Sequence, residues 1–197
     1  MDESKHVNIA ILSTGKGDNT DNIIKYFQNF IDAEISCIIS NKEDEHFSWI
    51  SKKYKIKTYC TKWYKEIDQI LTKHQIHYII LDNYLDKIPY NFIQKYNYQI
   101  INIHPSLLPN YGGKGMYGDT IHKIVKNNGD NKTGISVHFV DQDYNTGKVF
   151  FQKDVKIYPE DKWEDIKFKV QQLEKVYYPV IIEKLIRGTY DHLFKSI

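Results

Sequence analysis

The stretch Ile100-Ile-Asn-Ile-His-Pro-Ser-Leu-Leu-Pro109 decides how the rest of the 197-residue chain is interpreted. Its apolar start and the proline after His104 predict a buried strand that stops at Pro105, because proline cannot donate a ladder hydrogen bond. Residues two apart in a strand point to the same side, so Asn102 and His104 would present an amide and an imidazole together. Open α/β sheets bind ligands outside the carboxyl ends of their strands. The stretch therefore predicts a functional site at this strand end.

The continuation Asn110-Tyr-Gly-Gly-Lys-Gly-Met-Tyr-Gly118 contains four glycines and follows Pro109. Glycine and proline disfavour regular structure, so this segment is expected to be an irregular, mobile flap beside the site. Taken singly, Asn102 and His104 could also be core side chains on a strand that happens to end there. The whole string favours the functional interpretation.

The pattern on either side predicts the fold class. Short apolar runs alternate with helical spacing up to residue 104, and two strands of alternating pattern and a long apolar helix face follow. We therefore predict an α/β protein with a doubly wound, mostly parallel (Rossmann-like) sheet, antiparallel C-terminal strands and a long final helix in a single domain over residues 1–197. The strands are expected at 7–12, 34–40, 56–60, 78–81, 100–104, 133–140 and 147–152, and the helices at 23–31, 41–54, 63–71, 120–126 and 166–185.

Composition narrows the class of partner. A protein that must bind nucleic acid is expected to have a basic surface. The net charge of +2 therefore argues against nucleic acid as an obligatory partner. No apolar run approaches the length of a membrane span and the start is too polar for a signal peptide, so a cytoplasmic protein is expected. Cys37 and Cys60 lie in predicted strands without metal-ligand spacing, and we expect buried thiols. Because Arg187 is the only arginine, bidentate arginine clamps on phosphate are almost excluded.

The string from Asn102 to Pro109 resembles the catalytic-strand signature of the folate-dependent formyltransferase family, and the resemblance extends over nearly the whole chain. It is greatest to members that transfer a formyl group from 10-formyltetrahydrofolate to the amine of glycinamide ribonucleotide in purine synthesis. Tyr111 to Gly118 is similar to the flap of one bacterial branch. The resemblance implies a cytoplasmic monomer or homodimer that acts on two small molecules without a metal.

The resemblance also implies catalytic roles. Asn102 would donate to the oxyanion of the tetrahedral intermediate, and His104 would donate to it and act as a general acid toward the departing folate nitrogen. The family has an aspartate before a glycine turn that keeps the histidine protonated, and this chain has Asn145 there. An amide does not stabilise imidazolium by charge, so the pKa of His104 should be raised less. Asp141 and Asp143 are the neighbouring alternative acids.

The loop after the first strand would hold the phosphate of the nucleotide. A strand, a glycine loop and a helix start form a ready anion site, although a lone Gly-x-Gly is a weak signal. Asp18 stands where the family has a neutral residue, and its alternative role is a helix N-cap. Glu174 matches a glutamate that contacts the glycinamide group, with a solvated helix face as the alternative. The residues implied for the nucleotide are Gly15, Lys16, Gly17, Asp18, Asn19 and Glu174.

The segment after the fourth strand would line the folate pocket. Asp82 and Asn83 replace the small residues of the family there, whereas Tyr84 keeps the aromatic residue. Backbone contacts would survive such changes. The residues implied for folate are Lys62, Leu85, Asp86, Lys87, Ile88 and Asn102.

Three alternatives remain at the level of sequence. A Rossmann dinucleotide binder is disfavoured, because the third glycine is missing and Ser40 ends the second strand where an acid is expected. Formyltransferases of other acceptors, such as amino sugar nucleotides or methionyl-tRNA, and formyltetrahydrofolate hydrolases generally carry a further domain, which we do not expect here. A drifted protein that keeps the fold and loses catalysis is supported by Asn145, Asp82 and Asp18.

Overall fold

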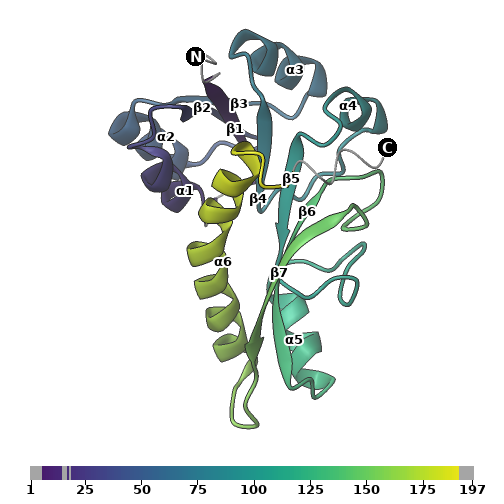
Figure 1. The fold of residues 1–197 in the computed structure, drawn as a ribbon. Coiled ribbons are helices and arrows are strands. Elements are labelled where there is room, and N and C mark those ends of the chain that lie inside the picture. The colour runs from purple at the N-terminus through teal and green to yellow at the C-terminus, as the bar shows by residue number, and fades with distance from the viewer. Residues whose placement is uncertain (1–5, 15–16, 18, 191–197) are drawn as a thin grey trace. The chain divides into compact units, whose positions relative to one another are not determined.

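The computed structural model of the chain describes residues 6–14, 17 and 19–190 (Figure 1). Backbone contacts divide it into two compact units, the first ending at Ile101 and the second beginning at Asn102. Strand β5, Ile100–His104, begins in the first unit and ends in the second.

The first unit alternates strands and helices, as the sequence predicts. Its elements are β1 Val7–Ser13, α1 Thr20–Phe27, β2 Ala33–Ser40, α2 Glu45–Tyr54, β3 Lys57–Cys60, α3 Tyr64–Lys73, β4 Tyr78–Asp82 and α4 Tyr90–Lys95.

Strand β1 is the centre of the first unit. It pairs in parallel with β2 on one side and with β4 on the other, and β2 pairs in parallel with β3, which gives the order β3-β2-β1-β4. The run from Ile9 to Leu12 is completely buried. Parallel strands covered on both faces have continuous apolar runs instead of alternation, which explains the pattern of this segment.

The second unit is built on antiparallel strands and two helices. It contains α5 Asp119–Asn127, β6 Lys132–Phe139, β7 Val149–Lys156 and α6 Trp163–Ile186, with the strand order β5-β6-β7. Strands β6 and β7 are antiparallel, with an irregularity between Val137 and His138. Helix α6 contacts α5 and both strands (Figure 1).

The predicted fold class is confirmed: the sheet is mostly parallel, its last strands are antiparallel, and a long helix ends the fold. Helix α4 was not predicted; it is a short helix whose N-cap is Pro89. The first helix ends at Phe27 and does not extend to Ile31, which is 94% exposed. The single-domain organisation stays a prediction.

The prediction of two buried thiols is confirmed for Cys37 and wrong for Cys60. Cys37 is buried in β2, and burial raises the pKa of its thiol to about 12. Cys60 is exposed, because it is the last residue of β3, the first strand in the sheet order.

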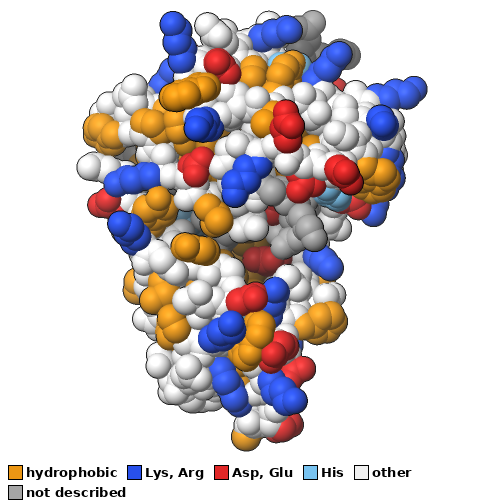
Figure 2. All heavy atoms as spheres, turned by 180° about the vertical axis from the view of Figure 1, so that it is seen from behind, with side chains coloured by type: hydrophobic (Ala, Val, Ile, Leu, Met, Phe, Trp, Pro, Cys, Tyr) orange, Lys and Arg blue, Asp and Glu red, His pale blue; other side chains and the backbone are white. Residues whose placement is uncertain are grey.

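Charges are spread over the face seen in Figure 2, where lysines lie among acidic and apolar side chains. None of the helices in the described part of the chain is long and apolar enough to cross a membrane. Among the same residues, no group of three or more His, Cys, Asp and Glu side chains is arranged to hold a metal ion.

Two isoleucines of the first unit give a matched test of where its core lies. Ile79 in β4 is completely buried, whereas Ile31 is 94% exposed. We expect Ile79→Ala to lower the free energy of unfolding by about 2–5 kcal/mol, because it leaves a cavity. Ile31→Ala should change it by less than about 0.5 kcal/mol. Urea unfolding of both variants measures the difference, and similar losses would contradict this assignment of the core.

Candidate active site

Asn102 and His104 lie at the end of β5, two residues apart, as the sequence predicts. The side chain of Asn102 is half-buried, and His104 is 3% exposed. Pro105 follows and the strand ends. From Asn110 to Gly118 the backbone makes turns without a helix or strand, so the predicted irregular segment is confirmed; its mobility stays a prediction.

Asn102 belongs to a small polar cluster with His138 and Asn145. Nδ1 of His138 lies 2.8 Å from the carbonyl oxygen of Phe139, which can only accept, so Nδ1 carries the proton. Nε2 of the neutral ring then accepts from Nδ2 of Asn102 at 3.2 Å. The same amide nitrogen donates to Oδ1 of Asn145 at 3.4 Å. Both amide protons of Asn102 therefore have acceptors inside the protein.

His104 is held by the flap rather than by this cluster. Its Nε2 lies 2.8 Å from the carbonyl oxygen of Tyr111, so Nε2 carries the proton of the neutral ring. Tyr111 has a left-handed backbone with φ of 58°. Its hydroxyl donates to Asp130 and accepts from Asn128 at 2.9 Å. Tyr111 is thus held at its backbone carbonyl by His104 and at its hydroxyl by Asp130 and Asn128.

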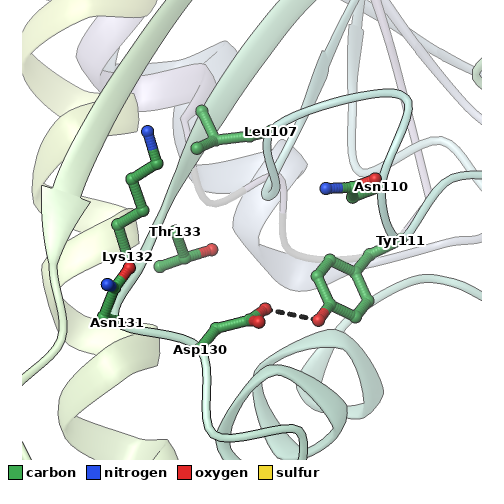
Figure 3. A pocket seen from close by; sticks show the side chains of 7 residues that line it. All are labelled: Leu107, Asn110, Tyr111, Asp130, Asn131, Lys132 and Thr133. Atoms are coloured by element: carbon green, nitrogen blue, oxygen red, sulfur yellow. Dashed lines mark hydrogen bonds between the residues drawn. The ribbon is translucent and has the colours of Figure 1, made fainter.

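A cavity of about 170 Å³ lies beside this flap segment (Figure 3). In Figure 3 the ring of Tyr111 points toward Asp130 across one side of the cavity. The cavity is lined by Leu107, Asn110, Tyr111, Asp130, Asn131, Lys132 and Thr133.

Burial keeps His104, His122 and His138 neutral. It lowers the pKa of His104 to about 4, and the hydrogen bond to Tyr111 opposes this shift only in part. It also lowers the pKa of His138, which the bonds to Phe139 and Asn145 oppose. The pKa of His122 on α5 is lowered to about 4 by burial and by the charge of Lys167. His104 is therefore a neutral hydrogen-bond donor in this arrangement.

In the first unit, the last residue of the predicted nucleotide loop, Asn19, donates hydrogen bonds to a buried carboxylate. Asp82, the last residue of β4, is 1% exposed. It accepts from the backbone amide of Asn19 at 3.0 Å, from the side-chain amide of Asn19 at 3.3 Å and from the hydroxyl of Thr20 at 2.7 Å. Asn19 is the N-cap of α1. Gly17 is buried beside this group, and Gly15, Lys16 and Asp18 lie outside the described residues.

The predicted folate segment is tied to neighbouring strand ends of the same unit. The amide of Leu85 donates to the hydroxyl of Thr14 at 3.2 Å, and Asn41 donates to the carboxylate of Asp86 at 2.6 Å. Ile88 is buried, whereas Leu85, Asp86 and Lys87 are exposed.

Two further predicted residues are placed singly. Lys62 is exposed, and its ammonium group lies 5.4 Å from the centre of the Trp63 ring. Glu174 is half-buried on α6. Their substrate contacts stay predictions, as do the roles of the other site residues.

Comparison with known proteins decides the family. Residues 7–182 match the formyl transferase family. The chain belongs to this family.

Individual relatives agree with the family match. The chain is 32% identical over 190 residues to phosphoribosylglycinamide formyltransferase of Haemophilus influenzae, covering 91% of this chain and 87% of that protein. It is 37% identical over 117 residues to the chloroplastic phosphoribosylglycinamide formyltransferase of Arabidopsis thaliana; this match spans 59% of this chain and 40% of that longer protein. The crystal structure of phosphoribosylglycinamide formyltransferase from Anaplasma phagocytophilum superposes with a TM-score of 0.83 at 26% identity, over 93% of this chain and 88% of that one.

Three residues that form the sites, Asp82, His138 and Tyr111, make contacts that the sequence did not predict. Sequence reasoning treated Asp82 as a departure from the family, although a polar residue ending a buried strand next to another such end is a signal for pairing. It gave no functional role to His138, whose ring accepts a hydrogen bond from Asn102. It expected Asn145 beside His104, whereas Asn145 contacts Asn102 and His138. Nε2 of His104 instead bonds the carbonyl oxygen of Tyr111, a backbone group that leaves no signal in sequence.

The two neutral histidines with pKa values of about 4 predict acid sensitivity. In the unfolded chain their pKa is about 6.5, so between pH 6.5 and 4 the unfolded state binds more protons than the folded one. The stability that they contribute is full above about pH 6.5 and is lost as the pH falls toward 4, by up to about 3 kcal/mol for each.

Urea unfolding at several pH values measures this loss. In His122→Gln the slope of the unfolding free energy between pH 6.5 and 4 should decrease, because one titrating group is removed. Equal slopes in wild type and variant would contradict a depressed pKa at His122.

Proposed function

We propose that this formyl transferase family member transfers a formyl group from 10-formyltetrahydrofolate to the amine of glycinamide ribonucleotide. The observation that carries the proposal is the pair Asn102 and His104 at the end of β5, followed by the flap. The family membership and the names of the relatives support it. We infer that the chain acts in the cytoplasm on these two small molecules, as a monomer or homodimer.

The reaction needs donors for a developing oxyanion and a group that moves a proton. Attack of the substrate amine on the formyl carbon converts the carbonyl oxygen into an oxyanion, and collapse of this intermediate releases the folate nitrogen, which takes a proton. In the proposed mechanism Asn102 and the Nε2–H group of His104 donate to that oxygen. The proton that the substrate amine loses passes to the neutral imidazole of His104. The resulting imidazolium then gives a proton to the folate nitrogen as its bond to the formyl carbon breaks, so His104 ends neutral.

The contacts of His104 suggest how the substrate enters this arrangement. The carbonyl oxygen of Tyr111 accepts the Nε2–H bond that the mechanism gives to the formyl oxygen. A formyl oxygen would therefore replace a backbone oxygen at the same donor. Movement of the flap segment would free the imidazole, and an exchange of one acceptor for another leaves the buried N–H group satisfied.

Asn102 has a similar exchange to make. Its amide protons donate to His138 and Asn145, and one of them must turn to the oxyanion during the reaction. The contact with Asn145 is the longer of the two at 3.4 Å, so it is the bond that costs less to break.

The nucleotide is assigned to the loop between β1 and α1, with Glu174 at the glycinamide group. The folate is assigned to the segment from Leu85 to Ile88, with Lys62 and Asn102. Support for the first assignment is the strand–glycine–helix order around Gly17. Support for the second is that the segment follows β4 at its carboxyl end.

A drifted formyltransferase fold that binds without turnover is the second candidate. The observation that favours it is Asn145, which stands at the position of the family carboxylate and contacts Asn102 and not a charged imidazole. The two candidates differ in one measurement: release of tetrahydrofolate from 10-formyltetrahydrofolate by the purified protein, with and without glycinamide ribonucleotide. Release that depends on the nucleotide supports the transferase, and no release supports the drifted protein.

Removal of either donor should nearly stop the reaction while the fold remains. We expect His104→Ala and Asn102→Ala to lower turnover about a hundredfold to a thousandfold each, because one oxyanion donor is lost. Steady-state rates and circular dichroism measure the two effects. Turnover close to that of wild type in a folded variant would remove that residue from the mechanism.

Restoring a carboxylate at position 145 should increase turnover on the acid side of neutral pH. The side chain lies beside His138 and Asn102, so the charge of Asn145→Asp should raise the pKa of His138 by about one to three units and that of His104 by less. Because the pKa of His104 is about 4 without this charge, the gain in rate should be largest between about pH 4 and 6, where the raised pKa keeps more of the imidazole protonated than in wild type.

NMR titration of the histidines and a pH–rate profile test this expectation, with Asn145→Ala as the control for loss of the amide. A rate of Asn145→Asp equal to that of wild type at every pH would show that the charge is not limiting.

A further inference from the structure

The carboxylate of Asp82 lies within hydrogen-bond distance of the beginning of α1. Asn19 is the N-cap of this helix, yet its side chain makes no capping bond. Instead, its amide nitrogen donates to Oδ1 of Asp82, and its backbone amide donates to Oδ2. The hydroxyl of Thr20 donates to Oδ2 as well. The helix start is thus held by a residue more than sixty positions away in sequence, at the end of another strand.

The same residue is also bound through its backbone. The hydroxyl of Ser13, at the end of β1, donates to the carbonyl oxygen of Asp82 at 2.8 Å. Ser13, Thr20 and Asp82 are each at most 1% exposed. Because β1 and β4 are paired in parallel with Ser13 opposite Asp82, the backbone fixes the carboxylate relative to the loop that leaves β1.

The loop glycine packs against this network. A Cβ atom on Gly17 would lie 2.6 Å from Oγ1 of Thr20 and 3.1 Å from both Oδ2 of Asp82 and Oγ of Ser13. Its φ of 57° is also one that side chains disfavour. The side chains of Ser13, Thr20 and Asp82 therefore pack closely against the backbone of Gly17, and Asp82 also bonds the backbone amide of Asn19.

A buried carboxylate is costly unless donors compensate its charge. Here three donors and the positive end of α1 face it. The backbone amide of Asn19, at the end of an anion-binding loop, is already used by an anion of the protein itself. An external phosphate must then be met by other donors near this helix start, such as the backbone amide of Gly17.

We propose that Asp82 is a positioning residue for the loop between β1 and α1: it fixes Asn19 and Thr20 and thereby sets where the loop amides meet the phosphate of the nucleotide. This rests on the proposed function for the identity of the ligand. Its placement of the loop stands apart from that function, because it depends on bonds within the first unit alone. Asp82 does not contact the reacting atoms in this role, so its loss should affect binding of the nucleotide more than turnover.

Three variants separate positioning from folding. Asp82→Ala removes every carboxylate bond, Thr20→Val removes one donor at constant shape, and Thr20→Ser keeps the hydroxyl. Thr58→Val, on β3 of the same unit, is the matched control for a threonine-to-valine change elsewhere.

We expect Asp82→Ala to weaken binding of glycinamide ribonucleotide about tenfold or more, because bonds to a charged group are lost. Thr20→Val should weaken it by a smaller factor, and Thr20→Ser and Thr58→Val should bind as wild type does. In steady state the KM for the nucleotide should rise while kcat changes by less than about threefold. Calorimetric titration of the nucleotide and initial rates measure these values.

Hydrogen exchange of the segment from Ser13 to Thr20 makes the inference testable without the nucleotide. The amide of Asn19 should exchange faster in Asp82→Ala than in wild type, since its acceptor is gone. If wild type binds no nucleotide, the proposed function fails, and the exchange rates alone decide whether Asp82 positions the loop. If Asp82→Ala does not fold, Thr20→Val carries both measurements.

Nucleotide binding as tight as or tighter than that of wild type in folded Asp82→Ala and Thr20→Val would overturn the proposal, and so would unchanged exchange at Asn19. Tighter binding would mean that the charge of Asp82 repels the phosphate and that this repulsion outweighs the gain from a fixed loop.

Discussion

The parallel pairing of β1 with its two neighbours is the constraint on which the first unit depends. Once Ile9 to Leu12 are buried between β2 and β4, the carboxyl ends of these strands must lie side by side. Loops that leave adjacent strand ends then lie close together because of the strand pairing alone, which is why open α/β sheets bind ligands at this edge. Polar residues at these ends, such as Ser13 and Asp82, find partners because the strands bring them together.

In the second unit, polar groups that the mechanism assigns to substrates are already bonded to the protein. The Nε2–H group of His104 has a backbone oxygen, and the amide of Asn102 has two side chains. An unsatisfied buried donor would cost about 1–3 kcal/mol, so such sites are stable only when internal acceptors take the place of ligand oxygens. Ligand binding then becomes an exchange between acceptors of similar strength, in which selectivity depends on geometry.

Sequence reasoning located the strands and the end of β5 because these depend on local patterns. Apolar runs predict buried strands, and Pro105 marks where the strand stops. It failed where the outcome depends on tertiary packing. Helix α4 is too short for a clear periodic signal, and Ile31 follows the spacing of α1 although the helix has ended. The polar ends of β1 and β4 signal that Asp82 has partners, but the donors that it bonds could not be predicted, because they depend on the register between two strands.

The two cysteines differ enough in their surroundings to make the protein easy to label. The thiol of Cys37 is buried and is held in its unreactive protonated form, whereas Cys60 is exposed at the end of β3. Only the thiolate attacks alkylating reagents, so a maleimide dye should attach at Cys60 while the fold stays intact. The chain therefore carries a natural attachment point for a fluorophore in the first unit, at the carboxyl end of a strand and outside the buried core. Ligand binding at that edge of the sheet could be followed by fluorescence in the unaltered sequence.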